Sequence, residues 1–292
     1  MKKLLFLTDF SAHAKHAAEY GYYLAKQIKA NVILCNVFTI PAETPHSTML
    51  VWPMDNGDAL EESSMDELKK LKAHLIKDHK EDFEPIVHII TEDGLLTDRV
   101  NNIVDGNHID MIIMGTHGNS GLSTLLLGNH ARNMIDNATK PLLWVPDTSK
   151  QKPVKKIAYA SDFTNRKEDL AAIYNLIDFA KGLNAEILII HIQDEEKPST
   201  SFKKWLDEFL IELSNKANYH NIYYRIEKRP NAEYGLDWLC QNGQIDMLAM
   251  LHRPKDFLSG LISGSYTQKM AKHIQIPLLV IPANVVYTIN DK

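Results

Sequence analysis

Three glycines at a fixed spacing are the residues of this sequence best suited to bind an anion. Residues 114–129 read MGTHGNSGLSTLLLGN, which places Gly115, Gly118 and Gly128 in the pattern Gly-x2-Gly-x9-Gly. A glycine has no Cβ, so its backbone N–H can approach a phosphate oxygen and its φ can be positive. Gly128 precedes a predicted helix, whose free N–H groups and dipole favour an anion. The alternative is that these glycines only serve tight turns, and the pattern is neither Walker A nor the Rossmann GxGxxG.

The elements around the glycines alternate between strand and helix. Apolar runs predict strands at 3–8, 32–38, 86–90, 111–114 and 142–145, and helical spacing predicts helices at 12–29, about 68–76, 95–104 and 129–138. Such alternation is typical of a parallel sheet with helices on both faces. With right-handed crossovers, we predict an α/β fold with a five-stranded sheet in the order 3-2-1-4-5, of the flavodoxin-like or adenine nucleotide alpha hydrolase-like type. Ser11 is the predicted N-cap of the first helix.

Ligands of doubly wound sheets bind outside the carboxyl ends of the strands, where the strand order reverses. Asp9 ends the first predicted strand, Val37 lies at the end of the second, and Gly115 ends the fourth. We therefore expect these three segments to converge on one crevice. His117 lies in the glycine loop, either as an exposed loop residue or as a donor to a phosphate oxygen or a metal-bound water.

The same order of sequence motifs occurs twice in the chain. Besides the glycine loop, four segments correspond in type and in order: residues 4–11 with 156–163, 31–38 with 186–193, 108–115 with 244–251, and 140–146 with 276–282. A single repeat of this length predicts tandem domains, because solenoid units are only about 20–50 residues long. We place the domains at 1–147 and 153–292, joined by a polar, proline-bearing linker.

Composition narrows the class of protein. The 292 residues suit two domains, and the 45% hydrophobic and 24% charged content is ordinary for a soluble protein. A net charge of −5 gives no reason to expect nucleic acid as a partner, and the sequence has no long apolar stretch that would span a membrane. Cys35 and Cys240 are expected to be buried and unpaired, and the cytoplasm is the expected location. His13 and His16 are one helical turn apart but have no evident third ligand, so no metal site is assigned.

With these motifs in this order, the chain resembles the universal stress protein family in its tandem form. The resemblance rests on the context MGTHG…LLLG, the opening LLFLTDFS and the closing KPLLWVP, and it covers nearly the whole chain. In the ATP-binding branch of that family, Ser or Thr usually follows the last glycine, where this chain has Asn129. The resemblance implies a stress-response or regulatory protein whose N-terminal half binds ATP with Mg²⁺.

The resemblance also implies roles for individual residues. Asp9 would contact the ribose or adenine end of the nucleotide, and the Val37 backbone would face adenine. The residues that it places around the phosphates are Gly115, His117, Gly118, Gly128, Asn129 and His130. Asn129 lacks the usual hydroxyl but keeps a side chain that can donate to a phosphate.

The second copy of the glycine loop, residues 250–265, has lost most of this chemistry. Leu251 and Pro254 stand in place of the first two glycines, and only the third survives, as Gly264. Proline has no N–H to offer a phosphate, and leucine adds a Cβ where close approach was needed. Asp162 corresponds to Asp9, but we favour a turn or helix-cap role for it. We expect nucleotide binding in the N-terminal half only.

Two other functions remain open at this stage. A related adenine nucleotide hydrolase or adenylyl transferase would carry an SGGxDS loop or an HxGH motif, and the sequence has neither. No catalytic residue is assigned, although slow ATP hydrolysis needs mainly positioning, charge and a metal. The other alternative is a ligand-free interaction scaffold with an unknown protein partner. Residues 39–58 would then cover either the nucleotide or a partner surface, or form an insertion without such a role.

The last strand of each half raises a question of assembly. Residues 142–145 and 278–281 are apolar and would each lie at the edge of a sheet, which is an aggregation hazard when unpaired. We expect the two halves to pair through these strands, as an internal pseudo-dimer about a pseudo-twofold axis. The alternative is two independent domains on a flexible tether, and a homodimer of the whole chain is compatible with either arrangement.

Overall fold

A computed structural model describes residues 1–40, 56–77, 83–116, 129–193, 200–253, 266–271 and 274–283. The first half contains β1 (Lys3–Leu7), α1 (Ala12–Gln27), β2 (Asn31–Phe38), α2 (Asn56–Ile76), β3 (Val87–Asp93), α3 (Leu96–Asn107), β4 (Met111–Gly115), α4 (Asn129–Asn137) and β5 (Leu142–Val145). The second half contains β6 (Lys156–Ala160), α5 (Arg166–Leu183), β7 (Glu186–Gln193), α6 (Thr200–Lys216), β8 (Ile222–Lys228), α7 (Ala232–Asn242), β9 (Met247–His252), α8 (Tyr266–Ala271) and β10 (Leu278–Pro282).

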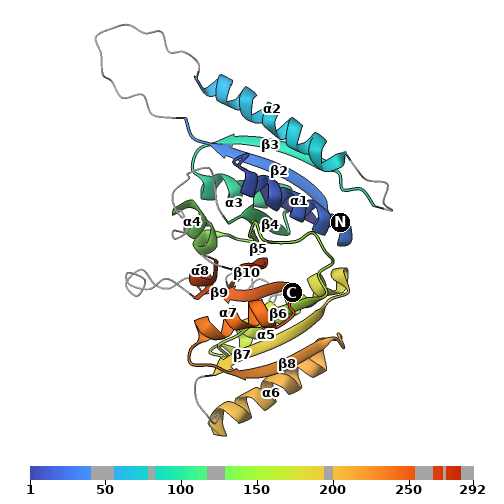
Figure 1. The fold of residues 1–292 in the computed structure, drawn as a ribbon, viewed down its shortest axis with the longest axis vertical. Coiled ribbons are helices and arrows are strands. Elements are labelled where there is room, and N and C mark those ends of the chain that lie inside the picture. Colours follow the sequence, from blue (N-terminus) through green and yellow to red (C-terminus); the bar gives the residue numbers. More distant parts are fainter. Residues whose placement is uncertain are drawn as a thin grey trace, which may run out of the picture.

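All ten strands form one sheet, in the order β3-β2-β1-β4-β5-β10-β9-β6-β7-β8. Each half therefore has the order 3-2-1-4-5 with parallel neighbours, which confirms the predicted fold class. The last strands of the two halves, β5 and β10, pair antiparallel, with Leu143 opposite Leu279. Figure 1 shows the two halves on either side of this β5–β10 seam. The pairing between closing strands is the one that the sequence predicts.

The central strands are buried on both faces because their side chains alternate between two helical layers, whereas β3 and β8, at the two edges of the sheet, are partly exposed. Leu4 and Phe6 belong to the core cluster shared with α1, α2, α5 and α6, whereas Leu5 and Leu7 belong to the cluster shared with α3, α4, α7 and α8. Both clusters cross the seam, since Leu143 and Leu279 lie in the first and β5 and β10 residues of opposite orientation lie in the second. The two halves thus share a continuous core, and the domain limits 1–147 and 153–292 stay a prediction.

Two elements differ from their sequence-based predictions. α2 begins at Asn56, so the end of the predicted loop 39–58 is helical; residues 41–55 lie outside the described residues. The first turns of α2 are largely exposed and so carry no apolar periodicity. β3 continues to Asp93, because it pairs along β2 as far as Phe38. The end of β3 is therefore set by the length of the neighbouring strand β2, and not by the end of the apolar run in β3 itself.

Local features follow the sequence closely. Ser11 is the N-cap of α1, and its side chain accepts a hydrogen bond from the N–H of Ala14. Cys35 is buried and Cys240 is half-buried, and both are free thiols. Burial raises the pKa of each thiol to about 12. Among the described residues, no helix is both long and apolar enough to cross a bilayer.

Candidate functional site

The carboxyl ends of β1, β2 and β4 bring three of the predicted site residues to one edge of the sheet. Phe6 on β1 is in register with Leu34 on β2 and with Ile113 on β4. Asp9, Val37 and Gly115 each lie two or three residues beyond these paired positions. The structure therefore gathers these three positions where the strand order reverses, as the ligand rule for such sheets requires.

The turn after β1 holds Asp9 in a specific conformation. Asp9 accepts a hydrogen bond from the N–H of Ser11 at 3.0 Å, and Thr8 accepts one from the N–H of Phe10, also at 3.0 Å. Phe10 has a φ of 62°, which is unusual for a residue with a Cβ and costs conformational energy. Such a residue persists only where its surroundings determine its conformation.

The second half reproduces this turn after β6. Asp162 accepts from the N–H of Thr164 at 3.1 Å, Ser161 accepts from the N–H of Phe163 at 2.9 Å, and Phe163 has a φ of 54°. The turn role predicted for Asp162 is therefore confirmed. Because the second half has lost most of the glycine loop, the turn does not depend on an intact loop in the same half.

A polar side chain on the second strand of each half clamps this turn. In the first half, Asn36 donates to the carbonyl oxygen of Thr8 at 2.7 Å and accepts from Ser64 of α2 at 2.8 Å. In the second half, His191 contacts the carbonyl oxygen of Ser161 through Nδ1 at 2.9 Å. A carbonyl oxygen only accepts, so Nδ1 carries the proton. Neither Asn36 nor His191 is among the site residues predicted from the sequence, although a polar residue inside an apolar strand is a usable signal.

Gly115 has a packing reason to be a glycine. A Cβ at this position would lie 3.0 Å from the carbonyl oxygen of His13, in the first turn of α1. The end of β4 thus approaches the start of α1 so closely that a Cβ here would require the neighbouring backbone to shift. This contact accounts for the glycine independently of any ligand, and it brings the N-terminus of α1 beside the end of β4.

Only some of the other predicted site residues lie in the part of the chain that the structure describes. His117, Gly118 and Gly128 lie outside the described residues. Asn129 and His130 open α4, and their backbone is helical. Within the described ranges, no group of three or more His, Cys, Asp or Glu could hold a metal ion.

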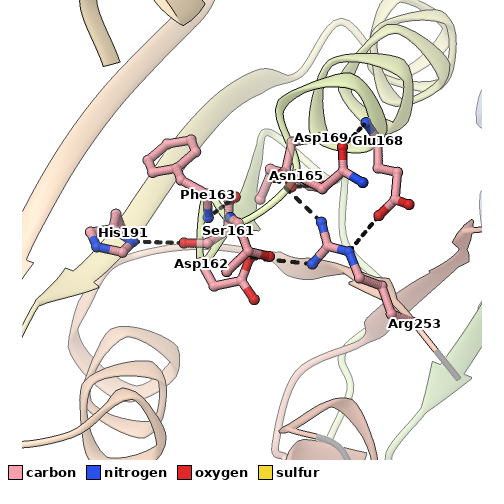
Figure 2. A network of polar contacts seen from close by, with 10 residues as sticks. Ser161, Asp162, Phe163, Asn165, Glu168, Asp169, His191 and Arg253 are labelled. Carbon is pink, nitrogen blue, oxygen red and sulfur yellow. Dashed lines mark hydrogen bonds and ion pairs between the residues drawn. The ribbon is translucent and has the colours of Figure 1, made fainter. Parts of the chain in front are cut away.

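The equivalent edge of the second half is occupied by an arginine. The guanidinium of Arg253, directly after β9, contacts three carboxylates: Glu168 through Nε at 2.5 Å, Asp162 through Nη1 at 3.2 Å, and Asp169 through Nη2 at 3.4 Å. Figure 2 shows this guanidinium between the turn after β6 and the start of α5. Arg253 stands at the position that His117 occupies in the first copy of the loop. A cation from the chain itself therefore lies beside Asp162, the counterpart of Asp9.

The acidic partners of Arg253 distinguish the two halves. Glu168 and Asp169 come three and four residues after the N-cap Asn165 of α5. The positions three and four residues after Ser11 in α1 are Ala14 and Lys15, and the first turn of α1 has no acidic residue.

Burial raises the pKa of Asp169, whereas the hydrogen bond from Tyr159, at 2.7 Å, and the charge of Arg253 lower it. Arg253 therefore compensates a carboxyl group whose ionised form burial disfavours. The first turn of α1 has no acidic residue that would repel an anion, whereas the first turn of α5 contains Glu168 and Asp169.

An aromatic cluster fills the neighbouring part of the second half. Phe163 lies 5.3 Å from His191 and 5.0 Å from Trp205, measured between ring centroids. His191 stacks on Phe202 at 5.1 Å, and Trp205 stacks on Phe209 at 5.3 Å. The ends of β6 and β7 are thus packed with side chains from α6.

Comparison with known proteins identifies the family. The model of the universal stress protein family matches residues 1–146 and again 153–282. The chain belongs to the universal stress protein family. Two matches cover nearly all of the chain, so the two halves are two copies of the universal stress protein unit.

Individual relatives agree with this assignment. The universal stress protein MJ0577 of Methanocaldococcus jannaschii is 31% identical over 153 residues, which are 49% of this chain and 94% of that protein. MJ0531 of the same organism is 27% identical over 150 residues, covering 51% of this chain and 85% of that protein. A crystal structure of a universal stress protein from Archaeoglobus fulgidus superposes with a TM-score of 0.68 over 96% of both chains, at 16% identity, and shares the fold.

Proposed function

We propose that the N-terminal half of this universal stress protein binds ATP together with Mg²⁺ and that the C-terminal half does not. The nucleotide would make the protein a stress-response regulator rather than a dedicated enzyme. We also propose the cytoplasm as its location, since both thiols are free and lie in different halves.

The observation that carries this proposal is the contrast between the two strand-end regions. In the first half, Asp9 stands beside a helix start without acidic residues, and the loop after β4 has three glycines in phosphate-binding spacing. In the second half, Arg253 and two acidic residues of α5 take up the corresponding space. Three carboxylates would repel the phosphates of a nucleotide. Arg253, the positive charge in this region, already pairs with these carboxylates.

The expected magnesium ion fits this scheme as an ion carried by the nucleotide. The described residues offer no cluster of three or more metal-binding side chains. Mg²⁺ in nucleotide sites is commonly held by phosphates and waters with only one or two carboxylates. Asp9 is the acidic residue of the gathered segments that could take part.

Isothermal titration calorimetry of the full-length protein with ATP and Mg²⁺ tests the proposal. We expect one site per chain. Gly118→Val should abolish binding, because a branched side chain blocks backbone approach to phosphate. Pro254→Val, at the matching position of the second copy, is the control and should leave binding unchanged.

Three outcomes would contradict this proposal. They are no binding at millimolar ATP, two sites per chain, and equal binding by Gly118→Val and the unsubstituted protein. A ligand-free scaffold would give the first outcome. Release of ADP over many turnovers would instead favour a hydrolase.

A further inference from the structure

One polar contact crosses the seam from the C-terminal half to the helix that follows the glycine loop. His252, the last residue of β9, is 1% exposed, and its Nε2 lies 3.0 Å from Oδ1 of Asp136 on α4. The two residues are 116 positions apart in the chain. A carboxylate accepts, so Nε2 of the imidazole donates to Asp136. A buried imidazole of one half thus bonds to a helix of the other.

α4 is a helix that both halves hold. Met134 and Ile135, next to Asp136, belong to the same core cluster as Leu278 and Val280 of β10. Figure 1 shows α4 near the seam, on the face that also carries α8. The apolar contacts fix the distance of α4 from the sheet, whereas a hydrogen bond with defined direction can fix its rotation and its position along its axis.

The opposite end of α4 is the end that matters for a nucleotide. α4 begins at Asn129, seven residues before Asp136, which corresponds to about 10 Å along the helix. A helix is stiff over two turns, so a shift at Asp136 moves the N–H groups at its start. Those N–H groups are the ones that would face a phosphate.

The residue after His252, Arg253, attaches the same chain segment to the C-terminal half. Arg253 is bound to Glu168, Asp162 and Asp169 of the second half. The chain segment His252–Arg253 is therefore tied to its own half by the guanidinium and to α4 by the imidazole. Both contacts come from positions where the first copy of the loop has Thr116 and His117.

We propose that His252 is a positioning residue for the nucleotide site of the other half: through Asp136 it holds α4 so that the helix start is aligned for phosphate. The altered loop of the C-terminal half has thereby become a support for the intact site. This inference rests on the proposed ATP binding by the N-terminal half.

The test compares variants of the full-length protein. His252→Phe removes the donor and keeps a ring of similar size, and His252→Gln restores a side-chain donor. Thr148→Val is the control, because it removes another long-range hydrogen bond to the C-terminal half, from Thr148 of the linker to the carbonyl oxygen of Gln275 at 2.7 Å, and Thr148 is not part of α4. ATP affinity with Mg²⁺ is measured by calorimetry, and amide hydrogen exchange of α4 is measured without nucleotide.

We expect His252→Phe to weaken ATP binding by on the order of tenfold, the equivalent of about one charged hydrogen bond. It should also speed amide exchange at Met134 and Ile135. Thr148→Val should change neither quantity more than about twofold, and His252→Gln should recover part of the affinity. Asp136→Ala should match His252→Phe, and the double variant should add little, since both remove the same bond.

The measurements distinguish failure of the proposed function from failure of the positioning role. If the unsubstituted protein does not bind ATP, the proposed function fails, and the positioning role fails with it. If it binds ATP and His252→Phe binds equally well, the proposed function stands and the positioning role is wrong. A loss of affinity that is equal in His252→Phe and Thr148→Val would also overturn the inference, because it would reflect the general attachment of the halves.

Discussion

Replacing Arg253 with methionine isolates the energetic role of the guanidinium in the C-terminal half. Methionine keeps much of the aliphatic length and removes the charge. The Arg253 side chain is 30% exposed, while its partners range from 60% exposed at Asp162 through 10% at Glu168 to 1% at Asp169. The three contacts should therefore differ strongly in energy.

The magnitude follows from these exposures. The exposed contact to Asp162 contributes about 0–1 kcal/mol. Breaking a buried pair by removing one partner costs about 3–5 kcal/mol. Asp169 keeps its hydrogen bond from Tyr159, and water can reach the partly exposed guanidinium site. We therefore expect Arg253→Met to lower the free energy of unfolding by about 2–4 kcal/mol at neutral pH.

Arg166→Met is the matched control. Arg166 is also partly exposed, at 33%, and it contacts two carboxylates, those of Glu208 and Glu212. Those carboxylates are 49% and 29% exposed, so they regain water when the arginine is lost. Arg166→Met should lower the free energy of unfolding by less than about 1 kcal/mol. Urea denaturation followed by circular dichroism measures both variants.

The cost of Arg253→Met should depend on pH. Burial raises the pKa of Asp169, and the positive charge of Arg253 partly offsets that rise. Without the guanidinium, the folded-state pKa rises further above the unfolded value. An acid with a raised folded-state pKa destabilises the fold when ionised, and this cost is relieved as pH falls through the folded-state pKa. The difference between Arg253→Met and the unsubstituted protein should therefore shrink as pH falls below neutral.

Equal losses of stability in the two arginine variants would refute this reasoning, because burial of the acceptors would then be irrelevant. A loss that grows as pH falls would refute the assignment of the effect to Asp169.

Two further predictions concern the seam and the thiols. Leu143→Lys with Leu279→Lys places two charges opposite each other in the β5–β10 pairing, at side chains that are 0% and 2% exposed, so the halves should separate and small-angle scattering should report a larger radius of gyration. Ile211→Lys, at a 61% exposed position on α6, is the control, and a double variant as small as this control would remove the case for strand-mediated pairing. Burial raises the pKa of Cys35 and Cys240 to about 12, so both thiols should react slowly with a disulfide reagent in the folded protein at mildly alkaline pH and rapidly in urea. Fast labelling of the folded protein would contradict the burial of these thiols.

The sequence alone determined the fold of each half. Apolar runs of strand length, helical spacing and the repeat between the halves are local or periodic signals, and they predicted the order 3-2-1-4-5 and the closing pair of strands. The same reasoning identified Ser11 as a cap and Asp162 as a turn residue, because capping and turn formation act over two or three residues. It also placed Asp9, Val37 and Gly115 at one edge of the sheet, since topology alone brings strand ends together.

Only the tertiary structure decided which side chains meet across the chain. The contacts of Arg253 with three carboxylates span 84 to 91 positions, and that of His252 with Asp136 spans 116. No periodicity links such residues, and their partners are fixed by strand register and by the seam between β5 and β10. The packing reason for Gly115 is of the same kind, because it depends on how closely α1 approaches β4. Local propensities thus determined the elements, whereas the contacts between elements determined that Arg253 and its carboxylate partners fill the strand-end region of the second half.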